Sequence, residues 1–201
     1  LISDYEVKVA RYKKTNVPEQ RQQQQQEAKP WVSDHSSKVE FLRGRGLGSG
    51  SYADVFLGLN TATGSFLAVK EVNLKIVNDT SKMDRINMLQ KEIKLMKGLN
   101  HKNIVRYLGT KWENEYFLIF MEYACGGSLT HMLQEFGKFQ ESLIKKYTKQ
   151  ILKGLEYLHC NRIIHRDIKG ANILIDESGV VKLADFGCSK KISDLLTPRT
   201  T

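Results

Sequence analysis

The sequence has few of the features that mark secreted, zinc-binding or membrane proteins. It contains three cysteines in 201 residues, and Cys125, Cys160 and Cys188 form no CxxC pair. This odd, scattered set excludes a disulfide framework and a cysteine zinc site, and it favours reduced thiols in a cytoplasmic protein. The longest apolar run, residues 116–121, is much shorter than the roughly 18 residues of a membrane helix, and the amino terminus has no basic-then-apolar signal pattern. We therefore expect a cytoplasmic location and no membrane span.

Positive charge is in excess, but it is not concentrated in one place. The formal net charge is +9, yet lysines are scattered through residues 8–14, 91–97 and 145–149. Lysines spaced in this way are typical of solvated helix faces, whereas a nucleic-acid-binding module needs clustered basic residues with interleaved aromatics. We therefore expect no nucleic-acid partner.

Residues 1–38 lack the apolar periodicity of a folded core. The glutamine run at residues 22–26, with prolines at positions 18 and 30, predicts a disordered, Gln-rich linker. Trp31 and Val32 could pack onto the domain that we expect at residues 39–201. Because the chain begins with Leu1 rather than Met, we expect that upstream sequence is missing.

From residue 39 the hydrophobic pattern predicts an α+β domain with five strands and three helices. Two strands are expected around a glycine hairpin within residues 41–58, and the others at residues 65–72, 103–108 and 116–122. The helices are expected at residues 81–98, with Thr80 or Ser81 as N-cap, and at residues 128–136 and 141–159. The predicted inward-facing side chains are Met83, Ile86, Leu89, Ile93 and Met96 in the first helix, and Ile144, Tyr147, Ile151, Leu155 and Leu158 in the last.

Two charged residues occupy positions where the pattern predicts burial. Lys70 lies in the apolar strand at residues 65–72, and Glu92 lies on the apolar stripe of the helix at residues 81–98. A buried charge is unfavourable unless an opposite charge pairs with it. We therefore predict an ion pair between Lys70 and Glu92, although Lys70 taken alone could be an ordinary solvent-facing strand lysine.

The turn between the first two strands is rich in glycine. Glycine lets a backbone approach a phosphate closely, because no Cβ intrudes and the amide groups can point at the ligand. A strand follows this loop, whereas the dinucleotide-binding fingerprint requires a helix there. The loop consists of Gly48, Ser49, Gly50, Ser51, Tyr52 and Ala53, with Ala53 at the place of a third glycine.

Acidic, basic and amide side chains gather after short apolar runs in the last part of the chain. Asp167, Lys169 and Asn172 lie in a loop between residues 162–164 and 173–175. A second acid, Asp185, ends the next apolar run. Asp167 and Lys169 can accept a proton and offset charge, while Asn172 and Asp185 offer the hard oxygens that suit magnesium.

In order and spacing, these motifs resemble the protein kinase family over about residues 41–191. The resemblance implies a bilobal α+β fold. Its small lobe, about residues 39–121, would hold a five-stranded antiparallel sheet and one helix, followed by a hinge at about residues 122–128. Residues 129–201 would be the first part of a helical large lobe. Because no Ala-Pro-Glu-type anchor follows before Thr201, we expect a C-terminally truncated fragment that is inactive alone.

The resemblance also implies the cofactors ATP and Mg²⁺ and the residues that contact them. Asp167 would orient or deprotonate the acceptor hydroxyl, and Lys169 would offset charge on the transferring phosphoryl group. Lys70, held by Glu92, would grip the phosphates. The implied metal ligands are Asn172 and Asp185, and the further ATP contacts are Leu47, the loop residues 48–53, Val55, Ala68, Met121 as gatekeeper, Glu122 and Ala124 of the hinge, Ser128 and Leu174.

Lys169, two residues after Asp167, matches serine/threonine kinases rather than tyrosine kinases. Residues 120–128, 165–172 and 185–190 look most like MEKK-type mitogen-activated protein kinase kinase kinases, although p21-activated and germinal-centre kinases share part of this pattern. The implied activity is transfer of the γ-phosphoryl group of ATP to a protein Ser or Thr, with a MAP kinase kinase as substrate. A non-catalytic pseudokinase scaffold is the alternative, but such proteins normally lose an equivalent of Lys70, Asp167 or Asp185.

The resemblance further implies control by an upstream activating kinase or by self-phosphorylation. Arg166 directly precedes Asp167, and a buried cation at that position would call for an anion such as a phosphorylated side chain. The candidate acceptors, among which the sequence does not choose, are Ser193, Thr197, Thr200 and Thr201.

Overall fold

The computed structural model describes residues 39–50, 53–73 and 79–191. Several predictions from sequence lie outside this description. They are the linker at residues 1–38 with Trp31 and Val32, the loop residues Ser51 and Tyr52, the side chains of Met83 and Ile86, and the candidate phosphorylation sites Ser193, Thr197, Thr200 and Thr201.

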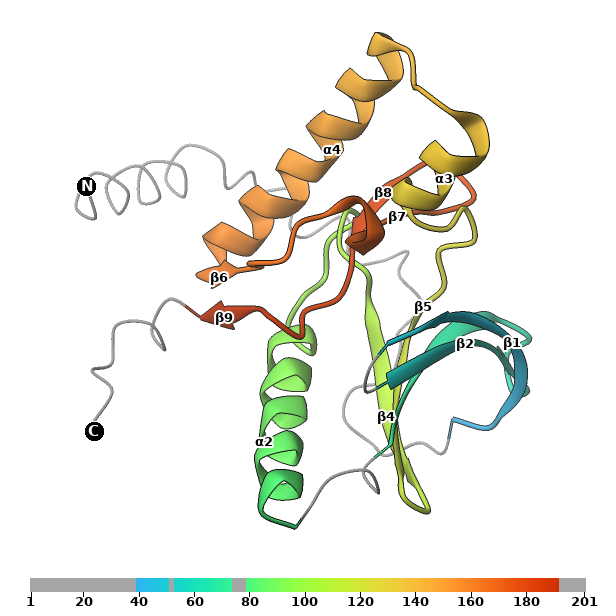
Figure 1. The fold of residues 1–201 in the computed structure, drawn as a ribbon, viewed down its shortest axis with the longest axis vertical. Helices are drawn as coiled ribbons and strands as arrows, with labels where there is room; N and C mark the ends of the chain where they lie inside the picture. The colour runs from blue at the N-terminus through green and yellow to red at the C-terminus, as the bar shows by residue number, and fades with distance from the viewer. Residues whose placement is uncertain (1–38, 51–52, 74–78, 192–201) are drawn as a thin grey trace, which may run out of the picture. The chain divides into compact units, whose positions relative to one another are not determined.

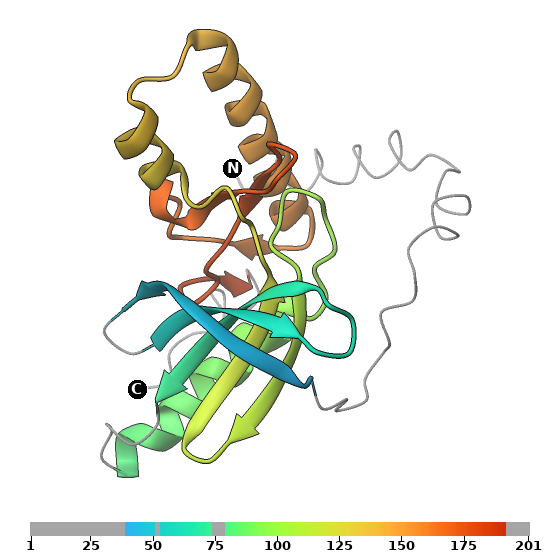
Figure 2. The same ribbon diagram turned by 90° about the vertical axis from the view of Figure 1, so that its right-hand side faces the viewer.

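Five antiparallel strands form one sheet, which confirms the predicted fold class. The strands are β1 (Phe41–Ser49), β2 (Ala53–Asn60), β3 (Phe66–Asn73), β4 (Tyr107–Glu113) and β5 (Tyr116–Glu122). Their order is β1-β2-β3-β5-β4 (Figures 1 and 2). β5 lies beside β3 because the chain leaves the sheet after β3, forms α2, and returns through the edge strand β4.

β5 carries side chains into two separate hydrophobic clusters. Phe117 and Ile119 belong to a cluster on the side of α2, whereas Leu118 and Phe120 belong to a cluster on the opposite face. Successive side chains of a strand point to opposite faces of a sheet. The continuous apolar run of β5 therefore follows from burial on both faces.

α2 (Asp79–Met96) covers one face of the sheet (Figure 1). The helix begins two residues before the predicted start, so Thr80 and Ser81 lie in its first turn and not at the N-cap. The described members of the predicted apolar stripe are all buried, namely Leu89, Ile93 and Met96.

Helices and two small two-stranded sheets follow β5. α3 (Leu129–Phe136) and α4 (Glu141–Cys160) precede the paired strands β7 (Ile173–Ile175) and β8 (Val181–Leu183), while β6 (Ile163–Ile164) pairs with β9 (Lys190–Lys191). Tyr147 and Leu158 of α4 are buried in the same cluster as the inner face of the sheet and α2. One continuous core therefore joins the sheet to the helical part. None of the helices in the described residues is both long and apolar enough to cross a membrane.

Two sequence predictions about these elements are wrong. Ile144 is 49% exposed and does not face inward, because the buried stripe of α4 passes through Leu143 and Tyr147, which both pack against the core. Residues 103–106 do not belong to a sheet strand, since β4 begins at Tyr107. Their backbone pairs instead with β8, where the Val105 amide donates to Leu183 at 2.9 Å and the Leu183 amide donates to Asn103 at 2.9 Å.

The double-sided burial of β5 predicts how two leucines differ in their contribution to stability. Leu118→Ala removes a side chain that is 0% exposed, and it should lower the free energy of unfolding by about 2–5 kcal/mol. Leu42→Ala is the matched control on a strand, because Leu42 is 61% exposed and its truncation should change the same quantity by less than about 0.5 kcal/mol. Calorimetric unfolding of both variants checks this, and equal effects would contradict the assigned core.

Candidate active site

A lysine, a glutamate and an aspartate from three separate elements meet on the α2 side of the sheet. The Nζ atom of Lys70 on β3 lies 2.9 Å from Oε1 of Glu92 on α2. The same Nζ lies 3.5 Å from Oδ1 of Asp185, which follows β8. Lys70 points this way because it shares its strand face with Val72, which packs in the same cluster as α2. The predicted Lys70–Glu92 ion pair is therefore present.

Burial and charge act in opposite directions on Lys70. Burial of the ammonium group lowers its pKa, but the carboxylates of Glu92 and Asp185 outweigh this effect and hold the pKa above the ordinary value. Lys70 is therefore a cation at neutral pH. Glu92 is 9% exposed, so its carboxylate in turn depends on Lys70 for charge compensation.

Asp167, Lys169 and Asn172 form a bonded group in the loop between β6 and β7. Nζ of Lys169 lies 2.8 Å from Oδ2 of Asp167, and Nδ2 of Asn172 donates to that oxygen at 2.8 Å and to the Asp167 carbonyl at 2.9 Å. The hydrogen bond from Lys169, and then that from Asn172, lowers the pKa of Asp167. Because the amide nitrogen of Asn172 faces Asp167, its Oδ1 points away from this acid.

Hydrogen bonds attach the turn that carries Asp185 to the loop that carries Asp167. The Ala184 amide donates to the Asn172 carbonyl at 2.9 Å. Nε2 of His165 donates to the Ala184 carbonyl at 3.0 Å, and its Nδ1 accepts from the Asp167 amide at 3.4 Å. A carbonyl can only accept, so His165 is neutral with its proton on Nε2. Burial lowers the pKa of His165 and favours this form.

The backbone of Asp185 adopts an unusual conformation. Its φ of 62° lies in the left-handed region, which residues other than glycine rarely occupy and which stores local strain. Phe186, the next residue, is 2% exposed, and its ring centroid lies 5.1 Å from that of His165. Burial of Phe186 therefore holds the turn in which the Asp185 carboxylate reaches Lys70.

Arg166 does not occupy the environment that its sequence position suggests. The residue is exposed, which corrects the prediction of a buried cation that needs an anionic partner. Its φ is 68°, and its Nε donates to the Cys188 carbonyl. The pairing of Ile164 with Lys190 brings that segment alongside, so the guanidinium group bonds a backbone oxygen at the surface.

The described part of the glycine-rich loop lies at one end of β1 and β2. Ser49 pairs with Asp54 in the final rung of the ladder, and the Gly50 amide donates to the Ala53 carbonyl at 2.9 Å. A Cβ on Gly48 would have no neighbour within 4 Å. Leu47 precedes this open stretch and is half-buried.

The residues predicted to surround adenine lie on the α2 side of the sheet and on β7. Val55 pairs with Lys70 and Ala68 pairs with Met121. Ala68 also lies two residues before Lys70, so these side chains share one face. Leu174 of β7 forms an isolated bridge with Ser128, which places it against the end of the segment that leaves β5.

Residues 123–128 connect β5 to α3 and, together with Glu122 at the end of β5, contain the predicted hinge contacts. Ser128 is the N-cap of α3, because its Oγ accepts the His131 amide at 3.2 Å. Ala124 is 6% exposed. Its amide donates to no acceptor among the residues that the structure describes, although buried backbone donors are normally paired. This amide is therefore a candidate donor to a bound ligand.

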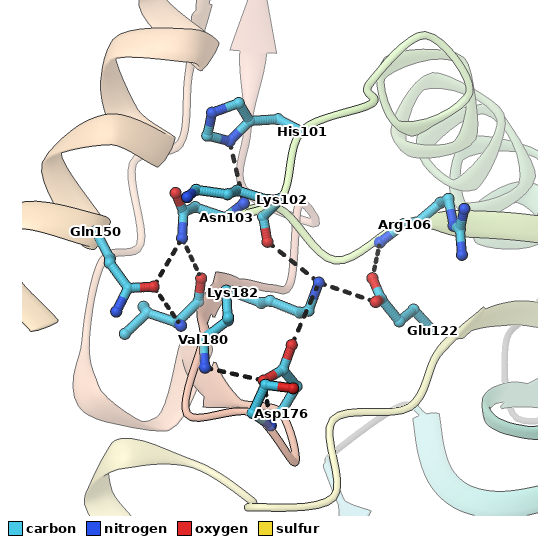
Figure 3. A network of polar contacts seen from close by, with 11 residues as sticks. His101, Lys102, Asn103, Arg106, Glu122, Gln150, Asp176, Val180 and Lys182 are labelled. Atoms are coloured by element: carbon cyan, nitrogen blue, oxygen red, sulfur yellow. Dashed lines mark hydrogen bonds and ion pairs between the residues drawn. The ribbon is translucent and has the colours of Figure 1, made fainter. Parts of the chain in front are cut away.

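Lys182 on β8 is a buried, ion-paired lysine that the sequence pattern does not single out. Its Nζ lies 2.9 Å from Oε1 of Glu122 and 3.9 Å from Oδ2 of Asp176 (Figure 3). The signal that could have found it is the same as for Lys70, namely one lysine inside a short apolar run at residues 180–184.

Comparison with known proteins identifies the class to which this arrangement belongs. A family model described as "Protein kinase domain" matches residues 41–200. The chain therefore belongs to the protein kinase family, and the family predicted from its motifs is confirmed. Protein kinases in general use ATP and Mg²⁺.

Within the family, the chain is similar to mitogen-activated protein kinase kinase kinases, as its motifs predict. It is 50% identical over 167 residues to mitogen-activated protein kinase kinase kinase A of Dictyostelium discoideum, with 83% of this chain and 18% of that protein covered. It is 47% identical over 167 residues to mitogen-activated protein kinase kinase kinase ANP1 of Arabidopsis thaliana, with 82% and 25% covered. It is 48% identical over 162 residues to mitogen-activated protein kinase kinase kinase 2 of the same plant, with 79% and 25% covered. The chain thus spans a quarter or less of the length of these relatives.

The position of His165 predicts a dependence of stability on acid. Its pKa is lowered in the folded protein, so the folded state resists protonation more than the unfolded state, whose histidines titrate near pH 6.5. The contribution of neutral His165 to the free energy of unfolding is fully present above about pH 6.5 and is lost as the pH falls below that value. The loss is about 1.4 kcal/mol for each unit by which the pKa in the folded state lies below that in the unfolded state.

Chemical denaturation at pH 7 and at pH 5.5 measures this loss. His165→Phe should show a smaller difference between the two pH values than the unsubstituted protein does, whatever its absolute stability. His159→Gln is the control at a half-buried position at the end of α4 and should keep the full difference. An unchanged pH dependence in His165→Phe would contradict the neutral tautomer.

Proposed function

We propose that this chain carries the nucleotide-binding and catalytic residues of a serine/threonine protein kinase of the mitogen-activated protein kinase kinase kinase type. The kinase transfers the γ-phosphoryl group of ATP to a Ser or Thr hydroxyl of a MAP kinase kinase. The observation that carries the proposal is the meeting of Lys70, Glu92 and Asp185 at 2.9 and 3.5 Å. The names of the similar curated proteins support the choice of substrate.

The same proposal covers the organisation of the chain and its setting. Residues 1–38 are a linker, residues 39–121 the small lobe, residues 122–128 the hinge, and residues 129–201 belong to the large lobe. The protein acts in the cytoplasm and is activated by an upstream kinase or by itself.

The available donor and acceptor groups fit ATP and Mg²⁺. Oδ1 of Asn172 and the carboxylate of Asp185 are hard oxygens of the kind that magnesium prefers. The Lys70 ammonium is a cation for phosphate oxygens, and the buried Ala124 amide is a donor for the base. Bound magnesium would neutralise charge on the phosphates during transfer. The glycine-rich loop, with Leu47, Ser51 and Tyr52, would cover the phosphates, and Val55, Ala68, Met121 and Leu174 would enclose the base.

Asp167 and Lys169, which lie in the loop between β6 and β7, have different roles in the transfer. The lowered pKa of Asp167 makes its carboxylate a weak base, so its main role is to accept a hydrogen bond from the hydroxyl and to orient it. It takes the proton as the hydroxyl oxygen attacks the γ-phosphorus and the bond from that phosphorus to the bridging oxygen breaks, so that ADP leaves. Lys169, which is already held 2.8 Å from Asp167, places positive charge beside the transferring group.

Two substitutions in the full-length protein test the proposal. Asp167→Asn should reduce phosphoryl transfer by at least about 100-fold, because the acceptor for the hydroxyl proton is lost. Lys70→Met should reduce it by about 100- to 1,000-fold, because an electrostatic contact to the phosphates is lost. Transfer from labelled ATP with magnesium is measured to a kinase-dead MAP kinase kinase and to a generic acceptor protein.

Lys111→Met is the matched control, because Lys111 pairs with Glu113 on the edge strand, and it should leave transfer unchanged. Transfer to the generic acceptor alone would support the proposed kinase activity but contradict a MAP kinase kinase as substrate. It would favour a kinase of the p21-activated or germinal-centre-like type. Full activity of Asp167→Asn would contradict the mechanism. If the unsubstituted protein transfers no phosphoryl group, and a form with phosphomimetic residues at the candidate phosphorylation sites after residue 191 transfers none either, a non-catalytic scaffold is favoured.

A further inference from the structure

Lys182 is a second buried cation, and it has no role in the catalytic site proposed above. Its side chain is 8% exposed. Its Nζ lies 2.9 Å from Oε1 of Glu122 at the end of β5, 3.9 Å from Oδ2 of Asp176 in the β7–β8 turn, and 3.1 Å from the Lys102 carbonyl. Figure 3 shows these three groups converging on the one ammonium group. A buried ammonium is tolerated only with such partners, so the site joins segments that are distant in sequence.

The β8 side of this contact is held firmly. The Leu183 amide and carbonyl both bond the backbone of residues 103–105 at 2.9 Å. Nδ2 of Asn103 donates to the Val181 carbonyl at 2.8 Å, and Oε1 of Gln150 on α4 accepts the Val181 amide at 3.0 Å (Figure 3). The residues on both sides of Lys182 are therefore bonded through their backbones, and Lys182 projects from a fixed support.

The β7–β8 turn is held in the same way. Oδ1 of Asp176 accepts the amides of Ser178 and Val180, each at 2.9 Å. This bonding uses one carboxylate oxygen to close the turn and leaves the other directed at Lys182. Asp176 thus supports the position of the ammonium group, while its bonds within the turn hold its own carboxylate in place.

Glu122, the last residue of β5, pairs with Leu67 of β3 and leads into the connecting segment. Its amide donates to the Arg106 carbonyl at 2.9 Å, and its Oε2 accepts the Arg106 amide at 3.1 Å. With Oε1 on Lys182, both oxygens of the carboxylate are bonded. The first residue of the segment 122–128 is therefore tied to β8 through a single side-chain contact.

The other end of the segment is tied to the same hairpin by its backbone. The Gly126 amide donates to the Ile175 carbonyl, and the Ile175 amide donates to the Gly127 carbonyl, each at 2.9 Å. A Cβ on Gly126 would lie 2.9 Å from the Ile175 oxygen, so this approach requires glycine. The segment is attached at both ends to the hairpin that carries Leu174, and the Ala124 amide lies between the two attachments.

We propose that Lys182 is a positioning residue for nucleotide binding, because it holds Glu122 and so fixes the Ala124 amide relative to Leu174. The inference rests on the proposed kinase function, in which that amide and that side chain contact the base. Lys182 touches neither nucleotide nor substrate, and it acts only through Glu122. Its loss should therefore weaken nucleotide binding more than it slows phosphoryl transfer.

Steady-state kinetics of the full-length protein test this separation. Lys182→Met keeps the length of the side chain but removes its charge, and it should raise KM for ATP and Kd for ADP by about tenfold, a usual size for coupling between adjoining sites. The values of kcat and of KM for the acceptor protein should change by less than about twofold. Glu122→Gln removes the charge from the other partner and should raise KM for ATP in the same direction. Lys182→Arg keeps the charge and should restore most of the affinity.

Lys111→Met removes another ion-paired lysine and should leave KM for ATP unchanged. Thermal unfolding of Lys182→Met shows whether this variant is folded. If Lys182→Met does not fold, the kinetics of Glu122→Gln test the inference instead. Unchanged KM and Kd in Lys182→Met and in Glu122→Gln would overturn the inference alone. An equal loss in kcat and nucleotide affinity would assign Lys182 a general structural role and would also overturn it. If the unsubstituted protein binds no nucleotide, the proposed function fails and the inference fails with it.

Discussion

The need to pair a charge inside an apolar sheet face is the constraint that orders the site. Lys70 faces a cluster of hydrophobic residues on the α2 side, where an isolated ammonium group would be strongly unfavourable. Glu92 satisfies it directly at 2.9 Å, and this fixes how α2 lies against β3. Asp185 approaches the same cation from the helical part at 3.5 Å. One cation thus relates the sheet, the helix and the turn after β8, and the bonds between Asn172, Ala184 and His165 extend this relation to Asp167.

Features set by local pattern could be predicted from the sequence. Alternating apolar residues indicate the sheet, the helical stripe indicates α2, and the combination of burial and charge indicates that Lys70 meets Glu92. The convergence of Asp167, Lys169 and Asn172 follows from their closeness along one loop. The ATP contacts assigned through the family stay predictions, because they concern a ligand and not a contact within the chain.

Features set by distant contacts could not be predicted in the same way. The apolar residues after Asn103 look like a strand of the five-stranded sheet, but their backbone bonds to β8. The local sequence does not indicate which strand such a segment will pair with. Arg166 looks like a buried cation until the pairing of Ile164 with Lys190 brings a carbonyl beside it. Ile144 continues the predicted stripe of α4, yet Leu143 of the same turn packs against the core in its place. The ion-pair partners of Lys182 both precede it in the chain, Glu122 by 60 residues and Asp176 by 6, so only the fold reveals that the three meet.

The two-sided burial of the sheet has a consequence for strand alignment. Neighbouring residues of β3 alternate between two hydrophobic clusters, with Val69 in one and Val72 in the other. A slip of β3 by one residue would exchange the faces and would move the Lys70 ammonium from Glu92 into a cluster that contains Phe56 and Phe120. A misaligned sheet would then hold an unpaired charge among aromatic rings. The residue that is needed for phosphate contact therefore also makes incorrect pairing of the strands costly, so that selection for chemistry would at the same time preserve the alignment of the sheet.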